Sequence, residues 1–313
     1  MGIICSWCDR YRCAEWSSHS YRAVHGLPLF IPRHDHTPLA LKLQDRQGIL
    51  RKNTEEKVKL ETGVSAVEVT HHGRTVYGDA YIPDAEEFPL VIFSHGYNGC
   101  KNDFRSDAAF LLKEGVASIT FTYCGSGARD RSGLATTRMT VFTEREDLEA
   151  VMDHAGSIKG FNGRLYLFGG SQGGLIAAMA AQTRPEDIAG LVLIFPALSI
   201  PDGWNGMYPE SRFPDPEDIP ETIPWMGVEL GRDFAAALRG FDIYEKMAEF
   251  TKPVMIFHGD ADSVIPISYS RRASETYPNC RYQTYPGVGH GFAPNLMAEV
   301  DDYLLKLIRT GDF

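Results

Sequence analysis

Short apolar runs alternate with amphipathic segments along most of this chain, and the alternation predicts an α/β architecture. Two early segments, 66–70 and 75–82, alternate polar and apolar positions as the strands of an antiparallel pair do. The largely apolar runs that indicate buried strands are 89–93, 118–123, 165–168, 191–195 and 254–257. Helical patterns separate several of these runs, at 104–114 and 144–154. This order favours a mostly parallel sheet with helices on both faces.

The alternation stops between residues 197 and 251. This stretch contains six prolines and two tryptophans, Trp204 and Trp225, and regains a helical pattern only at 232–239. A long segment without periodicity at the carboxyl edge of such a sheet is often an active-site cover. Aromatic side chains there suit a flat ring, although each tryptophan taken singly is better explained as holding the insertion onto the body. We therefore predict a lid insertion at about 197–251.

Residues 1–60 mix aromatic, histidine, proline and charged positions with no sustained period. We treat them as an N-terminal extension without an assigned role, and residues 61–313 as the catalytic domain. Cys5 and Cys8 form a C-x2-C pair, which can be half of a zinc site, but the second pair is absent and no metal site is predicted. The three cysteines of the domain show no spacing that demands a disulfide.

The strongest chemical signal is the segment 165–179, which reads LYLFGGSQGGLIAAM. An apolar strand leads into two glycines, Ser171, two more glycines and an alanine-rich helix. Residues 169–173 fit G-x-S-x-G, the strand-to-helix turn that exposes the nucleophile of α/β-hydrolases. Glycines let the backbones pass closely at this strained turn, and the N–H groups that begin the helix point toward developing negative charge. Ser171 is the predicted nucleophile.

A nucleophilic serine needs a base and an orienting carboxylate, and on this fold the chain order is serine, acid, histidine. Asp260 and Asp262 follow the predicted strand 254–257, and His290 follows a later strand between two glycines. Both positions come after strand ends, where open α/β sheets place their chemistry. We predict His290 as the general base. We favour Asp262 over Asp260 as the acid, since Asp260 could hydrogen-bond the turn backbone instead.

A fourth element lies upstream, where the predicted strand 89–93 runs into His95, a glycine and Tyr97. In this fold the loop at that place supplies the second N–H of the oxyanion hole. The predicted donors are therefore the backbone N–H groups of Tyr97 and Gln172. His95 is predicted to tie the loop rather than to react.

Composition narrows the range of partners. The chain holds 31 Lys and Arg against 41 Asp and Glu, for a net charge of −10, and contains no basic run, so we expect no nucleic-acid partner. An acidic surface also disfavours membranes, and no stretch approaches ~18 uninterrupted apolar residues. The N-terminus lacks a secretory pattern, so a cytoplasmic location is expected. A homodimer is left open.

The motifs together resemble those of the serine α/β-hydrolases, and in particular those of the bacterial cinnamoyl (feruloyl) esterases. The superfamily motifs are HGYNG at 95–99, GGSQGG at 169–174, HGDADSV at 258–264 and GHGF at 289–292. The more specific likeness lies in FTYCGSG at 121–127 and in the lid segments PEDIP at 216–220, PW at 224–225 and DIYE at 242–245. The similarity runs from about residue 65 to the C-terminus.

The resemblance implies an α/β-hydrolase fold and esterase activity on hydroxycinnamate esters, with Ser171, Asp262 and His290 as the triad and no metal or organic cofactor. In that group a lid tyrosine contacts the phenolic end of the substrate. Tyr244 occupies the matching position, although packing beneath the lid explains it equally well. Trp225 is the second candidate for substrate contact. The expected partner is a small-molecule ester.

Other hypotheses stay open. A serine exopeptidase or aminoacyl-peptidase would use the same triad on amides, and a general short-chain carboxylesterase would use it on simpler esters. A non-enzymatic binding module on this fold is disfavoured, because such a protein has no need of serine, acid and histidine in order beside glycine-lined turns.

Overall fold

The computed structural model describes residues 60–203 and 216–313. The predicted N-terminal extension, with Cys5 and Cys8, lies outside the described residues apart from residue 60, and so does Trp204 of the predicted lid.

Eight strands form one sheet in the described part of the chain, in the order β1-β2-β4-β3-β5-β6-β9-β10. β1 (Gly63–His71) and β2 (Arg74–Ile82) are antiparallel, and β2 is also antiparallel to β4 (Ala117–Thr122). The other strands run parallel to β4; they are β3 (Phe88–Ser94), β5 (Phe161–Gly170), β6 (Gly190–Ile194), β9 (Val254–Gly259) and β10 (Cys280–Tyr285). The predicted mostly parallel sheet with an antiparallel opening is confirmed.

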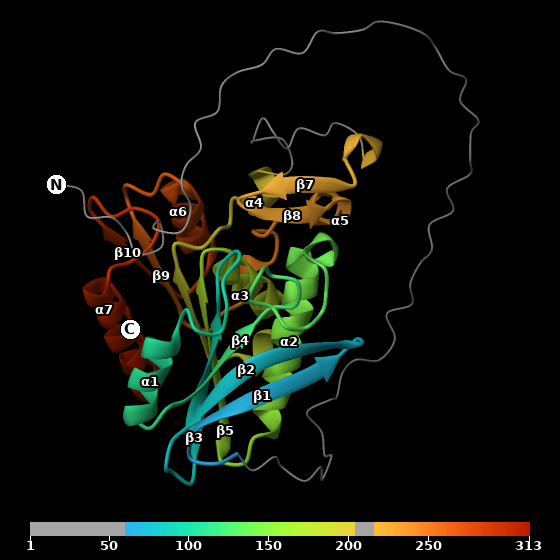
Figure 1. Cartoon of the computed structure of the whole chain (residues 1–313). Helices are drawn as coiled ribbons and strands as arrows, with labels where there is room; N and C mark the ends of the chain where they lie inside the picture. The colour runs from blue at the N-terminus through green and yellow to red at the C-terminus, as the bar shows by residue number, and fades with distance from the viewer. Residues whose placement is uncertain (1–59, 204–215) are drawn as a thin grey trace, which may run out of the picture. The chain divides into compact units, whose positions relative to one another are not determined.

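Helices cover both faces of this sheet (Figure 1). α1 (Arg105–Lys113) and α7 (Pro294–Thr310) bury side chains in one hydrophobic cluster. The helices that contribute to the other cluster are α2 (Val141–Ser157), α3 (Gln172–Thr183) and α6 (Ile267–Thr276). The short helical segments are α4 (Ile200–Asp202), α5 (Arg232–Ala237), η2 (Thr136–Arg138), η3 (Pro185–Asp187), η6 (Pro216–Asp218) and η7 (Met247–Glu249).

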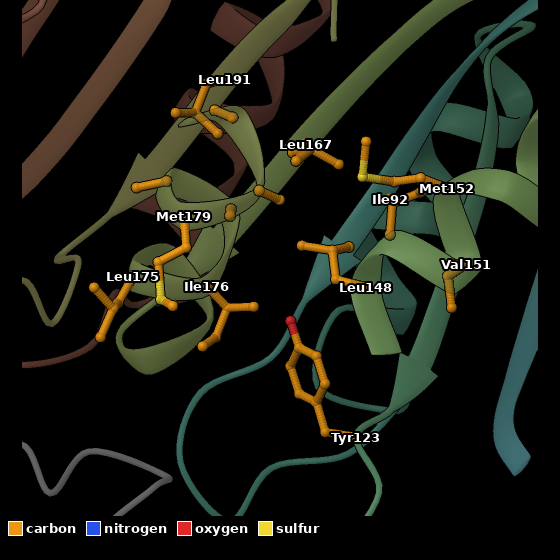
Figure 2. Close-up of a cluster of buried hydrophobic side chains, with 14 of the residues drawn as sticks. Ile92, Tyr123, Leu148, Val151, Met152, Leu167, Leu175, Ile176, Met179 and Leu191 are labelled. Atoms are coloured by element: carbon orange, nitrogen blue, oxygen red, sulfur yellow. The ribbon is translucent and has the colours of Figure 1, made fainter. Parts of the chain in front are cut away.

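The core between the sheet and the helices α2 and α3 follows from the spacing of apolar residues. Leu148, Val151 and Met152 are three and four residues apart on α2, which places them on one face of that helix. Side chains of α3 and of three neighbouring strands meet them in Figure 2; these are Leu175, Ile176, Met179, Ile92, Leu167 and Leu191. All of them are almost fully buried. This packing holds α3 against the sheet and so fixes the turn that precedes it.

The predicted lid contains regular structure that the sequence pattern did not indicate. β7 (Thr222–Trp225) and β8 (Val228–Gly231) form an antiparallel hairpin, seen near α4 and α5 in Figure 1. Its two turn residues, Met226 and Gly227, both have positive φ angles of 43° and 80°, as two-residue hairpin turns of the primed type require. The expectation of an irregular insertion was therefore wrong at this hairpin. Pro224 within a four-residue strand had hidden it, since proline normally argues against a strand.

Candidate active site

The site begins at the turn between β5 and α3, where Ser171 has φ 53° and ψ −122°. A positive φ is rare for a residue with a side chain and costs free energy. The surrounding structure holds it in place: the Ser171 N–H donates to the carbonyl oxygen of Ile194 on β6, at 3.1 Å. This is the strained strand-to-helix turn that the glycine pattern predicted.

The glycines around Ser171 are required by close backbone contacts. A Cβ atom at Gly173 would lie 2.1 Å from the carbonyl oxygen of Ser94, and one at Gly169 would lie 2.4 Å from that of Gly173. No side chain fits at such distances. The first contact also brings the end of β3, and the loop after it, against the start of α3.

The structure brings the predicted nucleophile, base and acid together. His290 Nε2 lies 3.0 Å from Ser171 Oγ, and His290 Nδ1 lies 2.7 Å from Asp262 Oδ2. Since a carboxylate oxygen only accepts, Nδ1 carries the proton and Nε2 is left to accept the proton of the serine hydroxyl. Phe195 packs edge-on against the His290 ring, with the ring centroids 4.8 Å apart. Sequence reasoning did not identify Phe195, although it directly follows β6.

Asp262 is held by four hydrogen-bond donors. Its Oδ1 accepts from the backbone N–H groups of Val264 and Ile265 at 2.8 and 2.9 Å, and its Oδ2 accepts from His290 and from His258. Burial alone raises the pKa of Asp262, but the hydrogen bonds from His258, His290 and the Ile265 N–H outweigh it and hold the pKa well below its usual range. Asp262 is therefore a carboxylate throughout the neutral range.

Asp260, the alternative acid, lies elsewhere. Its Oδ1 accepts from the backbone N–H of Gly287 at 2.6 Å, the turn-bonding role considered for it in the sequence. It is Asp262 that contacts His290.

The predicted oxyanion-hole residues begin or border the same turn. Gln172 is the first residue of α3, so its N–H has no partner within the helix and lies at the positive end of the helix dipole. Tyr97 follows β3 in the loop that contains Gly96, where an added Cβ would lie 3.2 Å from Ser171 Cβ. That loop is thus placed directly against the nucleophile. The Tyr97 hydroxyl donates to the carbonyl oxygen of Trp225, at 2.9 Å.

His95 ties this loop to β4, as predicted. Its Nδ1 donates to the carbonyl oxygen of Gly96 at 2.7 Å, and its Nε2 accepts from the N–H of Tyr123 at 3.1 Å. Complete burial lowers the pKa of His95, which keeps the ring neutral in this arrangement.

Comparisons with known proteins agree with this geometry. The structure of Est1E from Butyrivibrio proteoclasticus with bound ferulic acid matches with a TM-score of 0.72 and 28% identity, covering 78% of this chain and 100% of that chain. The chain has the α/β-hydrolase fold. A bifunctional esterase/perhydrolase from Acinetobacter calcoaceticus is 24% identical to this hydrolase over 268 residues, which is 71% of this chain and 92% of that protein.

A family model described as serine aminopeptidase, S33, matches residues 85–219 of the hydrolase. A monoacylglycerol lipase from Mycolicibacterium smegmatis is 24% identical over 245 residues, 69% of this chain and 86% of its own. These relatives support a hydrolase of the esterase kind.

Beneath the nucleophile turn the hydrolase buries a carboxyl group that sequence reasoning missed. Glu144 on α2 accepts a hydrogen bond from the side-chain amide of Gln172, at 2.6 Å. Burial raises the pKa of Glu144 to about 8; the hydrogen bond from Gln172 opposes this rise, and the nearby charge of Asp147 adds to it. The sequence pattern placed Glu144 in a predicted helix, 144–154, but did not indicate that Gln172 would contact it.

The two predicted substrate-contact residues have other partners in the hydrolase. The Tyr244 hydroxyl donates to the carbonyl oxygen of Tyr269 at 2.9 Å, and the Arg272 guanidinium lies 3.7 Å from the centre of the Tyr244 ring. Tyr244 is 7% exposed, so these contacts favour a packing role for this side chain. Trp225 ends β7 and packs partly buried against the core.

Within residues 60–203 and 216–313, no group of three or more His, Cys, Asp or Glu side chains could hold a metal ion. No helix in the same ranges has both the length and the apolar character needed to span a bilayer.

Proposed function

We propose that this hydrolase is a serine esterase that cleaves carboxylic esters through an acyl-enzyme on Ser171. The single observation that supports it most is the continuous series of contacts from Ser171 Oγ through His290 to Asp262, at 3.0 and 2.7 Å. The series ends on a carboxylate at one end and on a strained, glycine-flanked serine at the other. A structural role for these side chains would not require this order or this tautomer.

The reaction follows from these positions. His290 Nε2 takes the hydroxyl proton as Ser171 Oγ attacks the ester carbonyl, and Asp262 stabilises the imidazolium. The N–H groups of Tyr97 and Gln172 bind the oxyanion, and each such donor is worth about 2.7–4 kcal/mol in related hydrolases. His290 then gives its proton to the leaving alcohol. A water molecule, activated by the same nitrogen, releases the acid and restores Ser171.

For the acyl group we propose a hydroxycinnamate of the feruloyl type. The bound ferulic acid belongs to Est1E, and its transfer to this chain rests on the shared fold and on an insertion with aromatic residues at the carboxyl edge of the sheet. Trp225 and Tyr244 remain the proposed ring contacts. For Tyr244 this requires that the ring leave part of its packing when substrate binds.

The test compares three substrates: methyl ferulate, p-nitrophenyl butyrate and alanine p-nitroanilide. We expect the highest kcat/KM on methyl ferulate and a loss of about 10⁴-fold or more in kcat for Ser171→Ala. Ser274→Ala is the matched control, because Ser274 lies on α6 and donates only to the carbonyl oxygen of Arg271 in its own helix. Full activity in Ser171→Ala would refute the mechanism.

The second candidate is an aminopeptidase, which the description of the matching family model favours. Cleavage of the anilide with a higher kcat/KM than either ester would select it. Turnover of p-nitrophenyl butyrate alone would leave a general short-chain carboxylesterase.

A further inference from the structure

We propose that His258 is a positioning residue for Asp262 and controls how much negative charge Asp262 presents to His290, an inference that rests on the proposed function. His258 stands at the end of β9, one residue before the strand's last glycine. Its side chain is completely buried. It is no part of the proton path from Ser171, yet it contacts the acid directly.

Two imidazole rings share one carboxylate oxygen. His258 Nε2 lies 3.0 Å from Asp262 Oδ2, and His290 Nδ1 lies 2.7 Å from the same atom. The other oxygen, Oδ1, accepts hydrogen bonds from the N–H groups of Val264 and Ile265. Hydrogen bonds therefore hold both oxygens of the carboxylate and fix its orientation. His258 supplies the restraint on the oxygen that faces the base.

The neighbours of His258 decide which of its nitrogens carries the proton. Nε2 faces two acceptors, Asp262 Oδ2 and the carbonyl oxygen of Ile265 at 3.2 Å, so a proton must lie on Nε2. Nδ1 lies 2.7 Å from Ser270 Oγ on α6, and Ser270 is fully buried. With Nδ1 accepting, the Ser270 hydroxyl donates and every polar atom of the ring has a partner. The two acceptors at Nε2 thus set the tautomer that donates to Asp262, and Ser270 gives Nδ1 a partner in that state.

The consequence is a division of the charge on Asp262 between two donors. A hydrogen bond to a carboxylate withdraws charge from it, so the bond from His258 weakens the hold of Asp262 on the His290 imidazolium. Loss of that bond has two effects. The base becomes more basic, and the carboxylate becomes less well oriented.

No other charged side chain competes for this role among the described residues around Asp262. His258 and His290 are the titratable groups that contact it. Thr284 lies beside His258 on β10, and the charged residues of α6, Arg271, Arg272 and Glu275, are exposed. Asp260, on the same loop, is engaged with Gly287.

The test uses two substitutions of His258 on the full chain. His258→Gln keeps an amide N–H that can reach Asp262, whereas His258→Met keeps the volume and loses the donor. We expect His258→Met to lower kcat on p-nitrophenyl butyrate by about 10- to 100-fold. We also expect the acidic limb of its kcat/KM profile to move about 0.5–1 pH unit upward. His258→Gln should retain a kcat and an acidic limb close to those of the wild type. Ser270→Ala should give values between those of His258→Gln and His258→Met.

A purely structural role would lower the melting temperature of His258→Met without moving the acidic limb, and that result would overturn the proposal. If His258→Met does not fold, ¹⁵N-histidine NMR of the wild-type protein tests the proposal by locating the proton on the His258 ring. A ring without a proton on Nε2 would overturn the proposal. Ser171→Ala separates this inference from the proposed function. Activity that survives in Ser171→Ala refutes the function, whereas activity lost there but unchanged in His258→Met refutes only the inference.

Discussion

At the scale of single residues, the buried carboxyl groups near Ser171 differ in the donors that surround them. Asp262 has two backbone N–H groups and two imidazoles, and its pKa is depressed. Asp147 accepts from the Arg74 guanidinium at 2.6 Å and from the N–H of Cys124 at 2.7 Å. Glu144 accepts from a neutral amide, and its pKa is raised to about 8. Burial raises the pKa of both Asp262 and Glu144, but the donors to Asp262 outweigh it, so Asp262 is charged at neutral pH while Glu144 keeps its proton.

Glu144 gives a prediction for stability against pH. A carboxyl group whose folded pKa is raised stabilises the folded state below its unfolded pKa, and this contribution is lost as the pH rises through about 8. Glu144→Gln cannot ionise and so avoids this loss of stability at high pH. We expect its melting temperature at pH 9 to lie about 2–4 °C above that of the wild type, which corresponds to ~1 kcal/mol. At pH 5 we expect no such gain. Calorimetry at both values checks this. Glu186→Gln, at a side chain that is 88% exposed, is the control; an equal gain there would contradict the argument.

The residues that the sequence could predict are those whose backbone demands a motif. Close backbone contacts at Gly169 and Gly173 exclude side chains around Ser171, and Gly291 after His290 has a φ of 119°, so both residues leave a glycine signature in the chain. Glu144 and Ser270 have no such signature. Their roles depend on partners that the fold brings near from other elements, Gln172 for the first and His258 for the second. A sequence pattern does not encode those contacts.

At the scale of elements, the hairpin β7–β8 and the loop after β3 are joined. The Tyr97 hydroxyl bonds the last residue of β7, and the Thr136 hydroxyl bonds the carbonyl oxygen of Glu229 on β8 at 2.6 Å. An added Cβ at Gly231 would lie 1.8 Å from the carbonyl oxygen of Thr137, so η2 and β8 touch through their backbones. The hairpin is therefore held against the body on both of its strands.

Removal of the Tyr97 hydroxyl should loosen this hairpin. Tyr97→Phe keeps the backbone N–H and the ring but loses a hydrogen bond worth about 0.5–1.5 kcal/mol. We expect KM for methyl ferulate to rise about 2- to 10-fold, by a larger factor than kcat falls. Steady-state kinetics measure both constants. Tyr282→Phe, which removes a hydroxyl on β10, is the control, and an unchanged KM in Tyr97→Phe would show that the hairpin does not depend on this bond.

The elements themselves were largely predictable, because long apolar or amphipathic segments specify their own type. The predicted helix 104–114 corresponds to α1, which begins at Arg105 and ends at Lys113. The predicted strand 118–123 corresponds to β4, shifted by one residue. The hairpin β7–β8 was not predictable, since four-residue strands carry too little pattern.

At the scale of the whole molecule, the packing of α1 on α7 buries two carboxyl groups against each other. Asp107 on α1 and Asp301 on α7 are each 6% exposed, and the charge of Asp107 acts on Asp301. Burial raises the pKa of Asp301, and the charge of Asp107 raises it further, to about 8. Burial raises the pKa of Asp107 as well. Two like charges this close cannot both ionise at low cost, so the pair keeps a proton in the neutral range.

This pair should make the chain less stable in alkali. The stabilising contribution of the protonated pair is lost as the pH rises through about 8, on top of the general repulsion expected in a chain of net charge −10. In Asp301→Asn the amide donates to Asp107 at any pH, so the fall in melting temperature between pH 6 and pH 9 should be smaller than in wild type, by about 2–4 °C. Asp233→Asn makes the same change of charge at an exposed position of α5. If both variants reduce the fall in melting temperature equally, the change in net charge is the cause. If only Asp301→Asn reduces it, the buried pair makes the packing of α1 on α7 sensitive to pH.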